Sequence, residues 1–485
     1  MRTFRRLLTG LLAIGLLAIG LMHATALPGS AATPLPDIRG IYVIGQKFYL
    51  ENSPMPGQQT WLQQAIASPA VDGILIDLDW TDVASPTATK TYSWTLLDSM
   101  AQLAIAQGKK FEIAIITGGT TPSWVFTPQP QGLGAAFSNF EYVQADKPGA
   151  TCINEQLALP WDSNYIAALA DLLQQLSAHL KAQGWYSSMT MLRLTGINTL
   201  TDELRLPAQP PSAMAQFPCL NGNLQAWISA GYTQGKLATG WQQMLTASLR
   251  AFPDKFFNVA LITDNGFPAF MPDGTPVLSP PAAVQQASAV VVSNLMQLAG
   301  QQLRGQLVLQ SNGLVNLAQL DTTTISLAAA NGTLLAWQTN EWELQGGGAA
   351  CGGSRASPVT CQGEGEFSTL LMTGIYPQGS SGTNPLKASY LELFAPNILA
   401  FPTAVLKAHH TLLQGKFVPD DPPAPKPAPT PAPTAAATAM PASAPTTMPT
   451  PVPAAAPAPS ALPAPAAIPM PAPMSTPTAK PMPKS

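Results

Sequence analysis

Carboxylate, amide and tryptophan side chains recur where the apolar runs of this sequence end. Carboxylates and amides form hydrogen bonds with hydroxyl groups, and the flat, partly polar tryptophan ring is suited to stack on a sugar ring. No histidine or lysine accompanies them, so the pattern favours a neutral polyol ligand over a phosphate or a nucleotide. The predicted ligand contacts are Asp79, Trp80, Trp124, Asn198, Gln338, Trp342 and Glu392.

Two glutamates have positions suited to acid–base and nucleophilic chemistry. Retaining glycoside hydrolysis uses two carboxyl groups about 5–5.5 Å apart, one as nucleophile and one as general acid and base. Glu203 follows the fourth apolar run and Glu341 closes the seventh, and we predict that these two are catalytic. The alternatives are a solvated or capping role for Glu203, a structural ion pair for Glu341, and Glu343 in place of Glu341.

The predicted contacts have structural alternatives as well. Trp80 and Trp124 are residues that also pack in cores. Asn198 could equally cap a turn. Glu392 lies between two leucines, so it is either a ligand inside a barrel or a salt-bridged core residue, because a buried carboxylate is costly without a partner.

The elements that must position these residues alternate between strands and helices. Helical spacing of apolar residues over Thr95–Gln107, Ser163–Gln183 and Gln225–Ala251 separates apolar runs that suit parallel strands buried on both faces. Eight such units predict an α/β fold, a (β/α)8 TIM barrel with long loops, whose functional residues lie at the C-terminal strand ends. An open doubly wound sheet is the alternative, but no glycine-rich fingerprint follows the first run. The runs are Ile38–Gly45, Val71–Trp80, Lys110–Gly118, Met189–Asn198, Phe256–Asn265, Gln306–Asn312, Leu334–Trp342 and Ser389–Phe394.

Composition excludes several classes of function. The 485 residues carry a net charge of −3 and only 10% are charged, so there is no basic footprint for nucleic acid. Three of the four histidines, His23, His409 and His410, lie near the chain ends, so we expect no histidine-built metal site. We expect no cofactor, and an oligo- or polysaccharide as the partner.

The two ends of the chain predict a secreted or envelope-associated protein. Residues 1–32 have the basic start, apolar run and Ala-x-Ala site of a signal peptide, with an uncleaved membrane anchor as the alternative. Residues 33–415 form the predicted barrel. Residues 416–485 hold 23 of the 50 prolines and read as a disordered Pro/Ala/Thr-rich tail, through which the protein could associate with the cell envelope.

Secretion makes disulfides feasible for the four cysteines. Cys351 and Cys361 are close in a glycine-rich stretch and form the natural local pair, which leaves Cys152 to pair with Cys219. Three connectivities exist for four cysteines, so the other two remain open.

The sequence resembles the (β/α)8 glycoside hydrolases that carry the acid/base after strand four and the nucleophile after strand seven, of the β-galactosidase and cellulase-like type. The resemblance spans residues 38–410. It implies a glycosidase with Glu203 as acid/base and Glu341 as nucleophile, and the alternative is a non-catalytic carbohydrate-binding or cell-surface protein on the same barrel. The segments that carry it are Asp79-Trp80 with Tyr92-Ser93-Trp94 and Leu97-Asp98, Gly108 to Trp124, Thr195 to Glu203, and Asn340-Glu341.

Four features depart from that family pattern. Asp202 precedes Glu203 where the family has asparagine, and Glu203 stands seven residues beyond Gly196, which places it in a loop and not at the strand end. Ser85-Pro86 stands where the family has Glu-Pro, and no tyrosine on strand six is available to orient the nucleophile.

A third possibility is an envelope protein in which the tail carries the function and the barrel is an anchor.

Overall fold

The computed structural model describes residues 34–85, 89–144, 151–208, 222–263, 266–314, 320–339, 363–377 and 386–414. The predicted signal peptide and tail lie outside these ranges, as do Glu341, Trp342, Glu343, Cys219, Cys351, Cys361 and the side chain of Cys152. Within the described ranges, no helix combines the length and apolarity that crossing a bilayer requires.

In the described part of the chain, eight parallel strands close into a barrel with the neighbour order β1-β10-β9-β8-β7-β6-β3-β2. Closure confirms the predicted (β/α)8 architecture and excludes the open doubly wound sheet, in which the first and last strands would remain edges. The strands are β1 (Gly40–Gly45), β2 (Gly73–Asp79), β3 (Lys110–Ile116), β6 (Met189–Arg193), β7 (Phe256–Leu261), β8 (Leu307–Leu314), β9 (Leu334–Thr339) and β10 (Ala388–Phe394).

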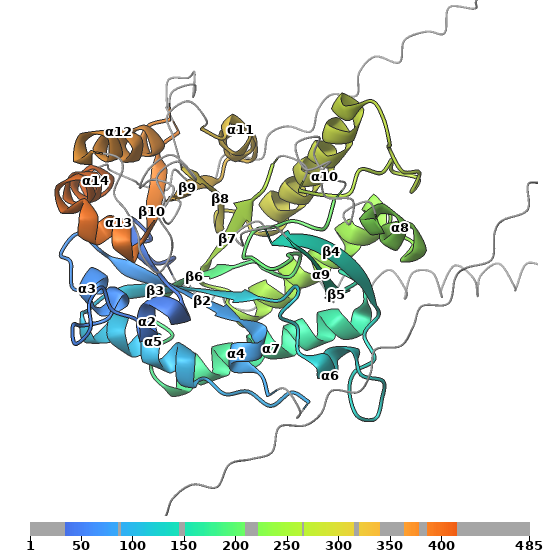
Figure 1. Ribbon diagram of the computed structural model, residues 1–485, viewed down its shortest axis with the longest axis horizontal. Coiled ribbons are helices and arrows are strands. Elements are labelled where there is room, and N and C mark those ends of the chain that lie inside the picture. Colours follow the sequence, from blue (N-terminus) through green and yellow to red (C-terminus); the bar gives the residue numbers. More distant parts are fainter. Residues whose placement is uncertain are drawn as a thin grey trace, which may run out of the picture. The chain divides into compact units, whose positions relative to one another are not determined.

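Helices surround the barrel (Figure 1). They are α2 (Lys47–Glu51), α3 (Trp61–Ile66), α4 (Trp80–Val83), α5 (Thr95–Ala106), α6 (Ser123–Phe126), α7 (Ser163–Ala182), α8 (Gly222–Ser229), α9 (Gln234–Ala251), α10 (Pro281–Gln302), α11 (Thr322–Asn331), α12 (Glu364–Ile375), α13 (Ala395–Ala400) and α14 (Pro402–Gln414). Helix α7 shows how the sequence specifies them: Asp162 accepts from the backbone N–H groups of Asn164 and Tyr165, and a leucine stripe faces inward.

The helix predicted over 225–251 is two helices instead. Helix α8 ends before Gly231, whose φ of 65° turns the chain in a conformation that glycine adopts readily. Thr233 then caps α9 by accepting from the N–H of Lys236. The apolar spacing continues across this break because both helices bury one face, so periodicity alone could not reveal it.

An antiparallel hairpin of β4 (Phe137–Gln144) and β5 (Thr151–Ala158) interrupts the alternation between β3 and α7. It is absent from the predicted elements. Helix α8 packs against β4, where Asn223 bonds both the N–H and the C=O of Glu141. The hairpin is therefore an insertion in the loop after strand three, on the edge of the barrel where a functional site is expected.

Inside the barrel an apolar layer is followed by a polar one. Met191, Phe256, Val308 and Tyr390 belong to a small buried cluster at one level. Two residues further along the same strands, toward their C-terminal ends, come Arg193, Asn258, Gln310 and Glu392. Side chains two apart share a face of a strand, so these four also point into the barrel. This polar layer forms the floor of the C-terminal end.

Candidate active site

Arg193, at the end of β6, is the centre of the polar layer. Its side chain is fully buried and contacts three carboxylates: Glu112 on β3, Glu392 on β10, and Asp202 beyond β6. One guanidinium thus faces three acidic groups in a volume closed to water. Burial and this positive charge act in opposite directions on the carboxyl pKa values.

Burial dominates for the acidic groups of this region. It raises the pKa of Glu392 to about 8 against the lowering effect of Arg193, and it raises that of Asp202 to about 6 in the same way. The pKa of Glu112 is also raised by burial. Asp77, at the end of β2, has its pKa raised to about 8 by burial and by the charge of Asp202. These four buried carboxyl groups therefore bind protons more tightly than exposed carboxyl groups do.

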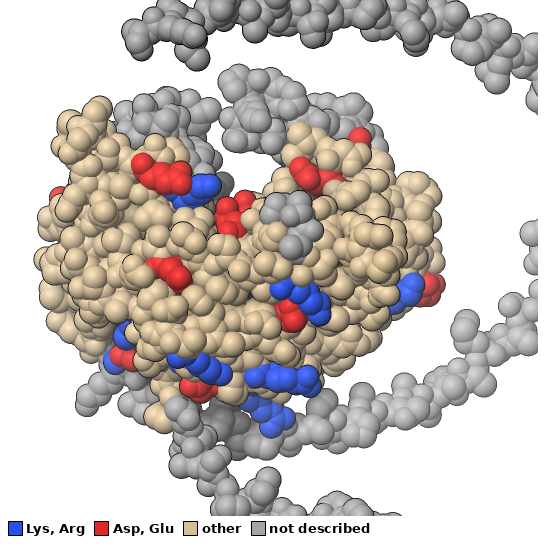
Figure 2. Space-filling model, turned by 90° about the horizontal axis from the view of Figure 1, so that it is seen from below, with Lys and Arg blue, Asp and Glu red and all other residues tan. Residues whose placement is uncertain are grey.

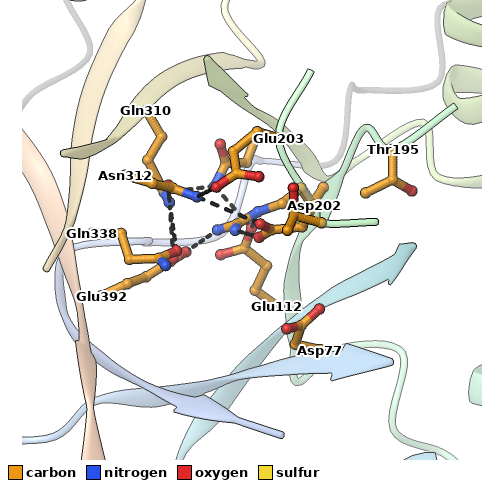
Figure 3. Close-up of polar contacts among 12 residues, drawn as sticks. Asp77, Glu112, Thr195, Asp202, Glu203, Gln310, Asn312, Gln338 and Glu392 are labelled. Atoms are coloured by element: carbon orange, nitrogen blue, oxygen red, sulfur yellow. Dashed lines mark hydrogen bonds and ion pairs between the residues drawn. The ribbon is translucent and has the colours of Figure 1, made fainter. Parts of the chain in front are cut away.

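Amide side chains complete the layer. Asn258 donates to Glu112 Oε1 at 2.9 Å and to Gln310 Oε1 at 2.8 Å, and it also bonds the Tyr390 hydroxyl. Gln310 donates to Glu392 Oε2 at 2.8 Å. These amides join strands from different sides of the barrel, and they fix the carboxylates before any ligand binds (Figure 3).

Glu203 occupies a strand-end position although it comes well after β6 in the sequence. Leu194 N donates to Asn258 O at 2.8 Å, and the next N–H to bond β7 is that of Leu204, which donates to Ala260 O at 2.7 Å. Leu204 also bridges Leu261 in the parallel sense. The segment 195–203 is thus a detour out of the strand, and the chain rejoins the line of β6 at Leu204. Glu203 stands at the barrel mouth for this reason.

The Glu203 carboxylate is held on one side. Asn312 Nδ2, on β8, donates to its Oε1 at 3.1 Å. Its Oε2 is buried and has no hydrogen-bond partner among the described residues. Asp77 shows the same pattern, since Gln46 donates to its Oδ2 at 2.9 Å while Oδ1 is buried without a partner. Both carboxyl groups retain an oxygen that could bond a hydroxyl group.

Asn198 has a structural role in the detour. Its Oδ1 accepts from Thr117 Oγ1 at 2.8 Å, and its Nδ2 donates to the carbonyl of Thr201 at 2.8 Å. The side chain is buried, with 2% of its surface exposed. Both ends of the amide are therefore engaged within the loop, in line with the turn-capping alternative and not with a sugar contact.

The two predicted tryptophan platforms lie in the core. Trp80 is 0% exposed and Trp124 is 2% exposed. Their ring centroids are 6.2 Å apart in an edge-to-face arrangement, and Trp80 also contacts Tyr165. Neither ring presents a face to a ligand, because helices α4 and α6 turn both residues inward behind the strand ends.

The remaining predicted contacts divide between the mouth and the floor. Asp79 is partly buried, starts α4 with its N–H bonded to Asp82, and has its pKa raised to about 6 by burial and by Asp82. Gln338, on β9, accepts a long bond of 3.5 Å from Gln310. Glu392 is fully buried against Arg193, which makes it a salt-bridged residue of the barrel floor, the second of its two predicted alternatives.

Sequence reasoning missed the central residue, Arg193, together with Glu112 and Asn258. Each is a polar residue at an inward-facing position of an otherwise apolar strand, as in Met-Thr-Met-Leu-Arg. That signal was available, because a charge inside a buried strand requires partners. Within the described ranges, no three histidine, cysteine or acidic side chains gather in a way that could hold a metal ion.

The molecule has few charged side chains, since only 10% of its residues are charged. Figure 2 shows a mostly uncharged face with scattered small groups of acidic and basic side chains, and with acidic side chains visible in a hollow. A weakly charged surface provides no long-range attraction for a charged ligand.

No protein-family model matches the sequence, and no curated protein does. Similar solved structures include an intracellular xylanase from Thermoanaerobacterium saccharolyticum JW/SL-YS485 in complex with xylotriose, at 10% identity, 62% coverage of this chain, 72% of that chain, and a TM-score of 0.33. A GH10 protein from Paenibacillus barcinonensis matches at 12% identity, with 73% and 83% coverage and a TM-score of 0.38. An exo-β-1,4-mannosidase from Opitutaceae bacterium strain TAV5 matches at 13% identity, with 76% and 54% coverage and a TM-score of 0.38.

These similarities are at 10–13% identity, with TM-scores of 0.33–0.38. At such identities and TM-scores, the superpositions carry no residue role and no activity over to this chain. The assignment of a function depends on the site itself.

Proposed function

We propose that the protein is a secreted glycoside hydrolase that cleaves a β-linked oligo- or polysaccharide with retention of configuration. The observation that carries this proposal is the position of Glu203. It stands at the barrel mouth on the line of β6, the fourth barrel strand along the chain. Its Oε1 is held by Asn312, and its Oε2 is buried without a partner among the described residues. A general acid needs a fixed carboxyl group whose second oxygen can bond the leaving group, and no described residue competes for Oε2.

Glu341 is the proposed nucleophile. It follows Thr339, the last residue of β9, and β9 lies three places from β6 around the closed barrel. Its own position lies outside the described residues, so the carboxyl separation that retention requires, about 5–5.5 Å, is part of the proposal. Glu341 Oε would attack the anomeric carbon while Glu203 gives its proton to the departing glycosidic oxygen. In the second step Glu203 would take a proton from water, whose oxygen displaces Glu341.

The polar groups of the mouth would bind the sugar. Asp77 Oδ1 and Glu203 Oε2 are buried oxygens without partners, and Gln46 Oε1 is a third. Sugar hydroxyls donate hydrogen bonds and would complete these groups. With Trp80 and Trp124 in the core, we assign recognition to hydrogen bonding and not to stacking on those rings.

Turnover of aryl β-glycosides and β-glucans by the oxidised full chain tests the proposal. Glu341→Gln should abolish hydrolysis. Glu203→Gln should slow substrates with poor leaving groups by about 10²–10⁴-fold, because they depend on general acid catalysis. A dinitrophenyl glycoside should form the glycosyl-enzyme nearly normally in this variant. Azide, which attacks without a base, should then restore its turnover.

Glu366→Gln is the matched control, since Glu366 is exposed in the first turn of α12. It should behave as the unmodified protein does. Turnover that survives both Glu341→Gln and Glu203→Gln would refute the assignment and direct attention to Glu343. Deleting residues 419–485 should leave activity on a soluble glycoside intact, unless the tail carries the function.

A non-catalytic carbohydrate-binding protein is the second candidate. The observation that favours it is Asp202, which replaces the asparagine expected before the acid/base and is bonded by Arg193. In that case the unmodified protein would turn over no substrate, although a saccharide would bind to it.

A further inference from the structure

We propose that Asp202 is a positioning residue: its ion pair with the buried Arg193 clamps the detour 195–203 to the barrel floor and thereby sets Glu203 at the mouth. The catalytic consequence of this clamp rests on the proposed function. The clamp itself is a property of the fold and can be tested without any substrate.

The first argument is the anchoring of Arg193 by rigid elements. Its Nε contacts Glu112 Oε1 at 3.3 Å, and its Nη2 contacts Glu392 Oε1. Glu112 lies on β3, the direct neighbour of β6, and Glu392 lies on β10, four places from β6 and therefore across the barrel. Held by both, the guanidinium presents Nη1 to Asp202 Oδ2 in a fixed direction. A planar guanidinium with several donors is suited to this arrangement.

The second argument is the sequence position of Asp202. It directly precedes Glu203, and one residue later Leu204 rejoins the ladder of β7. Asn312 Nδ2 reaches both acidic residues, at 3.5 Å from Asp202 Oδ1 and 3.1 Å from Glu203 Oε1. The ion pair and this amide therefore act on the last turn of the detour, where a shift would move Glu203 directly.

The third argument is the contrast with the beginning of the detour. There the chain is held by neutral bonds to the loop after β3 and to α7: Gly119 N donates to Thr199 O at 2.8 Å, and Tyr165 Oη donates to Gly196 O at 2.9 Å. In the middle of the detour Arg205 donates to hydroxyl groups, to Thr199 Oγ1 at 3.1 Å and to Thr201 Oγ1 at 2.8 Å.

The re-entry at Asp202 is tied by an ion pair to a buried charged group. A buried charge pair strongly disfavours any opening that leaves either member alone in the interior. An aspartate, and not the neutral asparagine of the resembled family, meets this requirement.

Amide hydrogen exchange of the full chain tests the clamp. In Asp202→Asn, exchange across 197–206 should become about 10- to 100-fold faster relative to the amides of β1 and β2, since a charged hydrogen bond is replaced by a weaker one. Glu392→Gln is the matched control, because it also removes a charge beside Arg193 but leaves a side-chain oxygen that can accept from Nη2 and hold the guanidinium, and it leaves Asp202 unchanged. It should not accelerate this segment selectively.

Unchanged protection of 197–206 in Asp202→Asn, or the same selective acceleration in Glu392→Gln, would overturn the clamp. If Asp202→Asn does not fold, Arg193→Lys provides the second variant, because it keeps the charge and loses the guanidinium geometry. It should accelerate the same segment, and normal protection there would also overturn the proposal.

The kinetic arm separates this inference from the proposed function. For an aryl β-glycoside with a poor leaving group, Asp202→Asn should lower kcat at least tenfold with KM little changed, and Asp202→Glu should restore part of the loss. Faster exchange together with an unmodified protein that turns over no glycoside would refute the proposed function and leave the clamp standing. Normal glycosidase activity of Asp202→Asn together with unchanged exchange across 197–206 would refute the clamp and leave the proposed function standing.

Discussion

Replacing Asp77 by asparagine should make the stability of the protein less dependent on pH. Burial and the charge of Asp202 raise the pKa of Asp77 from 3.8 to about 8, while the amide of Gln46 opposes this shift. Between these two values the folded protein holds a proton that the unfolded chain releases. The contribution of Asp77 to the free energy of unfolding is therefore most favourable below pH 3.8, and it is lost as the pH rises toward about 8.

The magnitude follows from the proton count. A difference of one bound proton changes the free energy of unfolding by about 1.4 kcal/mol per pH unit. A rise of two pH units within this window should therefore lower the free energy of unfolding, through Asp77, by on the order of 2–3 kcal/mol. The side-chain amide of Asp77→Asn would keep the bond from Gln46 and titrate no proton, so the variant should lose this part of the slope.

Urea unfolding at several pH values between about 5 and 7 measures the effect as a change in slope. Glu392→Gln should also flatten the slope, because burial raises the pKa of Glu392 to about 8. Asp273 is the control: it is exposed, and the N–H of Thr275 lowers its pKa, so Asp273→Asn should not flatten the slope. Equal slopes for Asp77→Asn and the unmodified protein would refute the account of a proton-retaining barrel mouth.

Two further predictions concern packing around the site. Trp80→Ala should lower the free energy of unfolding by about 3–5 kcal/mol in denaturant, because the ring is fully buried; a small loss with a large rise in KM for a glycoside would indicate a sugar contact instead. Gly118→Ala should lower the thermal midpoint, since a Cβ there would lie 1.8 Å from Thr199 O and would force the detour away from β3. Gly235→Ala, in α9 with open space at its Cβ, is the matched substitution, and equal midpoints for the two would contradict this reasoning.

Much of the fold could be predicted from local patterns. The predicted strands overlap all eight strands of the barrel, and Ser163–Gln183 differs from α7 by one residue at its end. Such elements are readable because apolar spacing and caps act within a few residues. The hairpin β4–β5 was missed because its strands Phe137–Gln144 and Thr151–Ala158 carry mixed polar residues. Its packing against α8 depends on Asn223, a residue distant in the sequence.

The candidate site shows a similar division. Glu203 could be singled out by its type and its order after the fourth run, but the sequence placed it in a loop beyond the strand. The hydrogen bond from Leu204 to Ala260 returns it to the strand end. Trp80 and Trp124 could be recognised as aromatic residues near strand ends, yet only their mutual packing shows that they face the core.

The sequence by itself determined the alternation of strands and helices, and with it the end of the barrel at which polar side chains collect. These features depend on the order of residues along one element. The tertiary structure alone decided that Arg193 binds Glu112, Asp202 and Glu392, and that Glu203 lies beside Asn312. Such partners come from strands brought together by closure of the barrel, and no local pattern encodes which inward-facing residues will then share a level.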